Sequence, residues 1–135
     1  MKKRSNIYIS IASLLAGGIL YVLFRENSYL GKLFAQCTVI IRLKALTSPL
    51  DSDLSKFHLP DFLWGLSLGC SLQAALGMKG YGILICGFVP FLCGALWECM
   101  QFFGIIPGTG DYWDIVSYFL AGAICIIINL KERKE

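Results

Sequence analysis

The stretch Leu96–Asp114, with the sequence LWECMQFFGIIPGTGDYWD, decides the fold because it joins two apolar runs that are each long enough to cross a bilayer. Pro107 and three glycines make its second half a turn. Glu98, Asp111 and Asp114 supply three of the nine acidic residues of the chain. Carboxylates are costly at membrane depth and usually face the interior of a helix bundle. The stretch therefore predicts a helical hairpin that places acidic groups at one face of a membrane.

The composition of the whole chain also indicates a membrane protein. Of its 135 residues, 56% are hydrophobic and 16% are charged, whereas soluble domains carry about a quarter charged residues. The apolar residues are gathered into blocks, which predicts a single all-α, polytopic domain with four transmembrane helices. The predicted spans are residues 7–24, 62–78, 81–103 and 114–130. A sheet is not expected, because an open sheet edge cannot be satisfied in lipid.

The connection from residue 25 to residue 60 does not read as a further span. Lys32, Arg42 and Lys44 interrupt its apolar part, and each costs about 2.5–3.5 kcal/mol at a helix centre in lipid. We expect an interfacial helix here, between the first and second spans. His58, the one histidine of the chain, precedes the second span and is interpreted as a surface residue. The six cysteines lack the short spacing of zinc or redox motifs.

Three of the predicted spans carry glycines on the same helical face as an acidic residue. These sets are Asp61, Gly65 and Gly69 in the second span, Gly87, Gly94, Glu98 and Gln101 in the third, and Asp114, Tyr118 and Gly122 in the fourth. Small residues let helices approach closely, so we expect these faces to pack together and Glu98 to point into the bundle. Pro90 should bend the third span, because proline removes a backbone donor and clashes with the preceding turn.

The predicted ligand-binding site follows from these faces. It consists of Asp61, Glu98, Gln101, Asp111, Asp114 and Tyr118. Several carboxylates so placed cannot all stay ionised without a cation or hydrogen-bond donors, so a compensating partner is expected for Glu98. No catalytic residue is assigned, and neither a cofactor nor a metal is expected. The alternative is that Asp61 and Asp114 only cap helices, worth about 0.5–2 kcal/mol each, and that Asp111 is an ordinary turn residue.

The basic residues predict the orientation. Four spans place both termini on one side, and that side holds seven of the twelve basic residues: Lys2, Lys3, Arg4, Lys79, Lys131, Arg133 and Lys134. Basic residues are enriched on the cytoplasmic side. The chain is therefore expected in the cell membrane with both termini in the cytoplasm and the acidic residues at the outer face.

Two motifs resemble those of VanZ-like membrane proteins. The first is Glu98-x-x-Gln101, then Pro107-Gly108, then Asp111-x-x-Asp114 opening a further span; the second is Leu59-Pro-Asp-Phe-Leu-Trp-Gly-Leu-Ser-Leu-Gly69. The resemblance covers about residues 60–130. This chain departs from the family pattern in three places: Gly108-Thr109 lacks an arginine, Tyr118 stands where asparagine is common, and Asp61 stands where relatives often have histidine. Because the family includes a protein linked to glycopeptide resistance, the resemblance implies a role in the cell envelope.

Three functions remain in competition. The first is a VanZ-like protein whose outer pocket binds an envelope component or a lipid head group. The second is a structural or accessory subunit that has no ligand site and binds a membrane-protein partner or a second copy of itself. The third is a membrane enzyme that uses paired carboxylates or a metal; against it, no arginine or histidine stands near the acidic motif in the sequence.

The charge of the chain indicates the class of partner. The small net charge of +3 and basic clusters beside apolar runs favour lipid over nucleic acid.

Overall fold

The chain is helical throughout the parts that the structure describes. The computed structural model describes residues 2–25, 29–50, 52–77 and 79–131, and there is no strand within these ranges. The long helices are α1 (Lys2–Phe24), α4 (Leu59–Leu76), α5 (Tyr81–Phe102) and α6 (Tyr112–Lys131). The short ones are α2 (Tyr29–Leu33), α3 (Thr38–Thr47), the 3₁₀ turn η1 (Ser48–Leu50) and the π-helical turn η2 (Leu54–His58). The expected all-α fold is thus confirmed for these residues.

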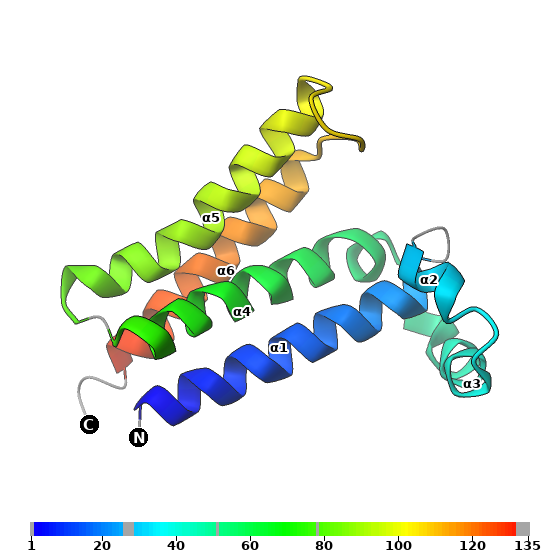
Figure 1. Cartoon of the computed structure of the whole chain (residues 1–135), viewed down its shortest axis with the longest axis horizontal. Helices are drawn as coiled ribbons and strands as arrows, with labels where there is room; N and C mark the ends of the chain where they lie inside the picture. Colours follow the sequence, from blue (N-terminus) through cyan, green and yellow to red (C-terminus); the bar gives the residue numbers. More distant parts are fainter. Residues whose placement is uncertain (1, 26–28, 51, 78, 132–135) are drawn as a thin grey trace.

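Helix α4 lies at the centre of the bundle and contacts each of the other long helices. Helix α1 packs along α4, while α5 and α6 form a hairpin that also lies against α4 (Figure 1). The start of α1 and the end of α6 lie together at one end of the molecule. The opposite end carries the turn between α5 and α6, and there the hairpin diverges from the α1–α4 pair (Figure 1).

Three of the described helices are long and apolar enough to cross a membrane. They are Arg4–Phe24, Tyr81–Phe102 and Tyr112–Lys131. They coincide, within a few residues at each end, with three of the predicted spans, and they support a multi-pass membrane protein. The charged residues 132–135 that follow α6 lie outside the described residues.

Helix α4 occupies the predicted second span, but it is not among these three helices, and its polar Asp61 and Gln73 lower its mean hydropathy. It begins with Pro60 in its first turn, where the fixed φ of proline suits a helix start. It ends at Gly77, whose φ of +59° is the left-handed conformation that closes many helices. Met78, the predicted end of this span, lies outside the described residues.

The glycine faces bring α4, α5 and α6 into close contact, as expected. A Cβ atom added to Gly87 of α5 would lie 2.7 Å from the carbonyl oxygen of Gly122 in α6. A Cβ atom on Gly69 of α4 would lie 2.9 Å from the sulfur of Cys125 in α6. Since real Cβ atoms do not approach so closely, these helices meet at distances that only glycine allows. Pro90 lies inside α5, and Figure 1 shows this helix changing direction along its length.

Buried polar side chains hold α1 against its neighbours. The amide of Asn6 donates to Asn129 of α6 at 2.8 Å, and the hydroxyl of Ser10 lies 3.2 Å from that of Ser67 and 2.6 Å from that of Ser71 in α4. Such bonds between helices stabilise bundles in lipid, where apolar contacts give little driving force. They fix the position of α1, whose far end forms one wall of the site described next.

Candidate functional site

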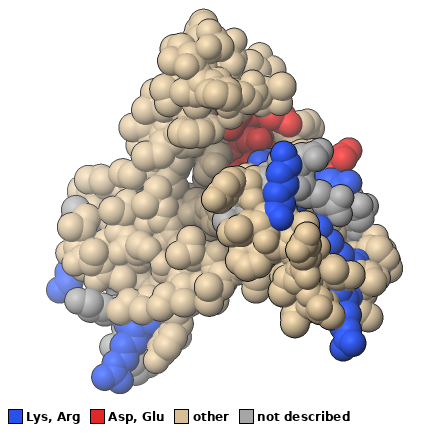
Figure 2. All heavy atoms as spheres, turned by 45° about the vertical axis from the view of Figure 1, so that its right-hand side comes forward, with Lys and Arg blue, Asp and Glu red and all other residues tan. Residues whose placement is uncertain are grey.

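A pocket of about 740 Å³ lies between the ends of the long helices, beside the α5–α6 turn. Its lining comes from α1 and the residue after it (Tyr21, Leu23, Phe24, Arg25), from η2 (Lys56, Phe57), from α4 (Asp61), from α5 (Glu98, Gln101), and from the turn and α6 (Gly108, Thr109, Asp111, Asp114). Figure 2 shows acidic atoms set into a hollow beneath the tip of the α5–α6 hairpin, with basic atoms beside them. Five of the six predicted site residues therefore line one pocket.

Glu98 points into the bundle from the last turns of α5, and only 4% of it is exposed. Its carboxylate oxygen Oε2 accepts a hydrogen bond from the backbone N–H of Asp111 at 2.9 Å. With its amide oriented to satisfy both polar atoms, Gln101 donates to the same oxygen at 3.2 Å and accepts from the Trp97 indole at 3.2 Å. The expected inward placement and compensating partner of Glu98 are confirmed.

The turn between α5 and α6 requires glycine at position 108 and ends at Asp111. Gly108 has a φ of +133°, and a side chain there would also collide with the amide of Gln101. The turn ends at Asp111, whose Oδ1 accepts the backbone N–H of Trp113 at 2.9 Å and so caps α6. Asp111 is thus a turn residue, as the alternative interpretation held, and it also caps α6, which the sequence analysis had not predicted. Its side chain still lines the pocket.

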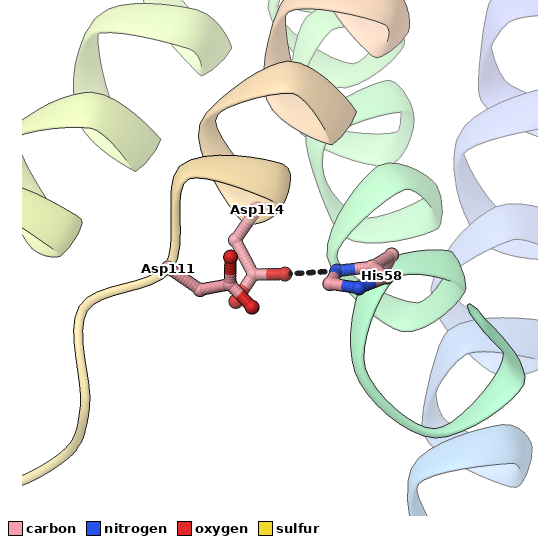
Figure 3. Close-up of side chains that lie close together, drawn as sticks. All are labelled: His58, Asp111 and Asp114. Carbon is pink, nitrogen blue, oxygen red and sulfur yellow. Dashed lines mark hydrogen bonds and ion pairs between the residues drawn. The ribbon is translucent and has the colours of Figure 1, made fainter. Parts of the chain in front are cut away.

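Asp114 forms a short hydrogen bond with a histidine from another part of the chain (Figure 3). Its Oδ1 lies 2.7 Å from Nδ1 of His58. Only 11% of the Asp114 side chain and 18% of the His58 side chain are exposed. His58 is therefore not the surface residue that the sequence predicted. The Asp111 carboxylate lies beside this pair, and one ligand atom from each of the three residues falls within 4.8 Å of the others.

Asp61 and Tyr118 join α4 to α6. The Tyr118 hydroxyl donates to Oδ1 of Asp61 at 3.3 Å. The Tyr118 ring fills a slot between two glycines: a Cβ atom on Gly65 would lie 3.1 Å from it, and one on Gly94 would overlap it. Tyr118 does not line the pocket itself, but its hydroxyl holds one of the pocket carboxylates.

Two basic residues share the pocket with these acids. The Arg25 guanidinium lies 5.2 Å from the ring centres of both Tyr21 and Phe57, and its Nε donates to the Lys56 carbonyl at 3.1 Å. Arg25 also attracts the carboxylates of Asp61 and Glu98 through space. Sequence reasoning missed Arg25 and His58. Their signal was position: Arg25 ends the first span and His58 precedes the second, at the face where the acids were expected.

The arrangement offers two kinds of chemistry. Carboxylate oxygens and an imidazole nitrogen are donors that suit a divalent cation or an ammonium group. The His58–Asp114 pair is also the arrangement in which a carboxylate orients a histidine as a general base. Four carboxylates against two basic side chains make the lining acidic as a whole.

Comparisons of this chain with protein-family models, with curated proteins and with solved structures give no match. No relative therefore lends the chain a family or an activity. Its function has to be inferred from the geometry and charge of the pocket.

Proposed function

We propose that this protein is a four-span, VanZ-like membrane protein whose pocket faces the outside of the cell and binds the polar head of a lipid or another envelope component. In this proposal α4 is the fourth span, since its 18 residues fall within the working range of about 17–25. The basic residues near the start of α1 and the end of α6 favour the cytoplasm for that end of the bundle.

The short helices fit the same orientation. Helix α3 has no buried residue. It exposes Val39, Ile41 and Leu46 together with the basic Arg42, and its second basic residue, Lys44, is half-buried. Apolar and basic side chains on one short helix suit the boundary between head groups and acyl chains. We therefore propose α3 as an interfacial helix at the level of the pocket.

The observation that carries the proposal is the convergence of Asp61, Glu98, Asp111 and Asp114 on one pocket of about 740 Å³. This volume lies within the roughly 300–1,000 Å³ of small-molecule sites. Ionisable groups at the ends of membrane helices are retained when they serve a function, since their burial is costly. The resemblance of residues 60–130 to VanZ-like proteins extends the proposal to a role in glycopeptide resistance.

The test combines Asp61→Asn with Glu98→Gln in a strain that lacks the gene. Both changes remove charge and keep shape. We expect that the strain carrying the double variant still differs from the wild type in envelope-stress tolerance and in glycopeptide susceptibility, as the strain without the gene does. Asp53→Asn is the matched control, because Asp53 is exposed and does not line the pocket. Wild-type phenotypes from a double variant present at normal abundance would refute the proposal.

The accessory-subunit function has one observation in its favour. Each of the four carboxylates accepts a hydrogen bond within the chain: Glu98 from Asp111, Asp111 from Trp113, Asp61 from Tyr118, and Asp114 at His58. The cluster can therefore stabilise the bundle without any ligand. A stoichiometric membrane partner in purified samples, together with full function of the double variant, would favour this alternative.

A further inference from the structure

We infer that the ligand of this pocket is a zwitterion with a primary ammonium group and a phosphate ester, as in the head group of an ethanolamine phospholipid. The inference rests on the proposed head-group function and names its chemical class. It starts from the fact that the pocket lining carries both signs of charge: carboxylates from α4, α5, α6 and the turn, and basic side chains from the residue after α1 and from η2.

The acidic wall suits an ammonium group. Ligand atoms of Asp111 and Asp114 lie within 4.8 Å of each other. A nitrogen placed between them can therefore donate to both at ordinary hydrogen-bond lengths of about 2.7–3.0 Å. Glu98 adds a third carboxylate that is almost fully buried. Attraction between charges is stronger where water is excluded, so this wall favours a cation with several N–H donors.

The aromatic residues of the pocket distinguish a primary from a quaternary ammonium. Quaternary groups have no N–H donor and bind over the faces of aromatic rings. Here the Arg25 guanidinium already lies over one face of Tyr21 and one face of Phe57, at 5.2 Å from each ring centre, and Phe24 is the remaining aromatic residue of the lining. The four carboxylates of the lining, by contrast, accept hydrogen bonds from a primary ammonium. The carboxylates thus favour ethanolamine-type over choline-type ligands.

The same stacking prepares the other wall for phosphate. Contact with both rings and the Nε bond to the Lys56 carbonyl fix the guanidinium plane at the pocket edge. A planar guanidinium matches the oxygens of a phosphate, and Lys56 is a second basic residue of the same lining. An ammonium and a phosphate on one ligand would satisfy both walls together.

The position of the pocket indicates the source of the ligand. Tyr21, Leu23 and Phe24 belong to the membrane-length helix α1, and the pocket lies where α1 and α5 end. The ends of spanning helices lie at the depth of the lipid head groups. We therefore expect a membrane lipid rather than a soluble molecule.

The test is lipid binding to the purified full-length chain, followed by native mass spectrometry and by the thermal unfolding midpoint. The probes are ethanolamine, choline and glycerol phospholipids with identical acyl chains, and soluble glycerophosphoethanolamine. We expect the ethanolamine lipid to bind about tenfold more tightly than the other two lipids, as one or two charge-assisted hydrogen bonds allow. Glycerophosphoethanolamine should bind more weakly than the ethanolamine lipid. If the two bind equally well, the ligand is still a zwitterion of this class, but the inference that it is a membrane lipid is wrong.

The variants address each wall separately. Asp111→Asn keeps the α6 cap, since asparagine caps as well as aspartate, and should abolish the preference for ethanolamine over glycerol lipid. Arg25→Gln should lower the affinity for both the ethanolamine and the glycerol lipid. If Arg25→Gln does not fold, Arg25→Lys is measured in its place and should retain part of the binding. Asp53→Asn should change nothing.

Equal affinity for the three lipids, or stabilisation by millimolar Mg²⁺ or Ca²⁺ in place of lipid, would overturn the inference. If in that case the Asp61→Asn, Glu98→Gln double variant still loses envelope function, the head-group proposal stands and the ligand class is wrong. If that double variant is fully functional, the proposed function fails as well.

Discussion

The carboxylate of Glu98 stands near the C-terminal end of α5, where the helix dipole disfavours negative charge. Its position is stabilised by the turn that follows, because the backbone N–H of Asp111 donates to it across the pocket edge. This one bond ties the end of α5 to the start of α6. Glu98 therefore positions Asp111 as well as adding its own charge.

Replacing Glu98 tests that role. Glu98→Gln keeps an acceptor for the Asp111 N–H and should change stability little. Glu98→Ala removes the acceptor from a part-buried donor and should destabilise the protein by about 1–3 kcal/mol. Thermal unfolding of both variants in detergent checks the difference. Equal stability of Gln and Ala variants would mean that the bond does not hold the turn.

The Tyr118 hydroxyl can be tested in the same way. Tyr118→Phe keeps the ring between Gly65 and Gly94 and removes only the donor to Asp61. We expect a loss of about 0.5–1.5 kcal/mol, and no further loss when Asp61→Ala, which removes the acceptor, is already present. Losses that simply add in a double-mutant cycle would show that the two side chains are not coupled.

Individual residues of the site could be predicted when a local rule identified them. Glu98 and Gln101 share a helical face with glycines, and Asp111 and Asp114 start a helix, so all four were found from spacing. His58 and Arg25 could not be found this way, because their partners come from distant parts of the chain. His58 meets Asp114, 56 residues away, and no pattern of period 3.6 reports such a contact.

At the scale of elements, glycine contacts determine how α4, α5 and α6 pack. The carbonyl of Gly122 lies where a side chain at Gly87 would project. The helices predicted from hydropathy were found with small shifts of their ends. The path of residues 25–60 was not predicted, because short helices with mixed polarity, such as η2, depend on tertiary contacts rather than on their own sequence.

Alanine substitutions measure this packing. Gly87→Ala and Gly94→Ala should each destabilise the bundle, by about 1–3 kcal/mol for overpacking a close contact. Gly18→Ala is a control within the same protein, since nothing lies within 4 Å of the added carbon, and it should be neutral or gain up to about 1 kcal/mol of helix propensity. A similar loss at all three positions would argue against close approach of α5 and α6.

The polar contacts of α1 give a second prediction for the elements. Asn6 and Asn129 are almost fully buried and bonded to each other. A double-mutant cycle with Asn6→Ala and Asn129→Ala should give a coupling of about 0.6–2 kcal/mol, as for other hydrogen bonds between membrane helices. Zero coupling in bilayer or detergent would mean that Asn6 and Asn129 do not contact each other and that α1 does not pack against α6 in this way.

At the scale of the whole molecule, the two ends of the bundle differ. One end holds the starts of α1 and α5, and the other carries the α5–α6 turn (Figure 1). The pocket lies at this second end, beside the turn. In a variant without native cysteines, Thr109→Cys at the pocket should react with a membrane-impermeant thiol reagent in intact cells. Tyr81→Cys, exposed at the start of α5, should react only after permeabilisation. The reverse pattern would invert the proposed orientation.

The central claim is that carboxylates from three long helices and one turn converge on a pocket that holds a polar head group. An experimental structure of the protein in nanodiscs of native lipid tests it most directly. We predict a head group within about 2.7–3.2 Å of the Asp111 and Asp114 carboxylates, with Glu98 buried beneath the turn. A structure in which Asp61, Glu98 and Asp114 point to separate faces, or in which α1 closes the pocket against α5, would contradict the account.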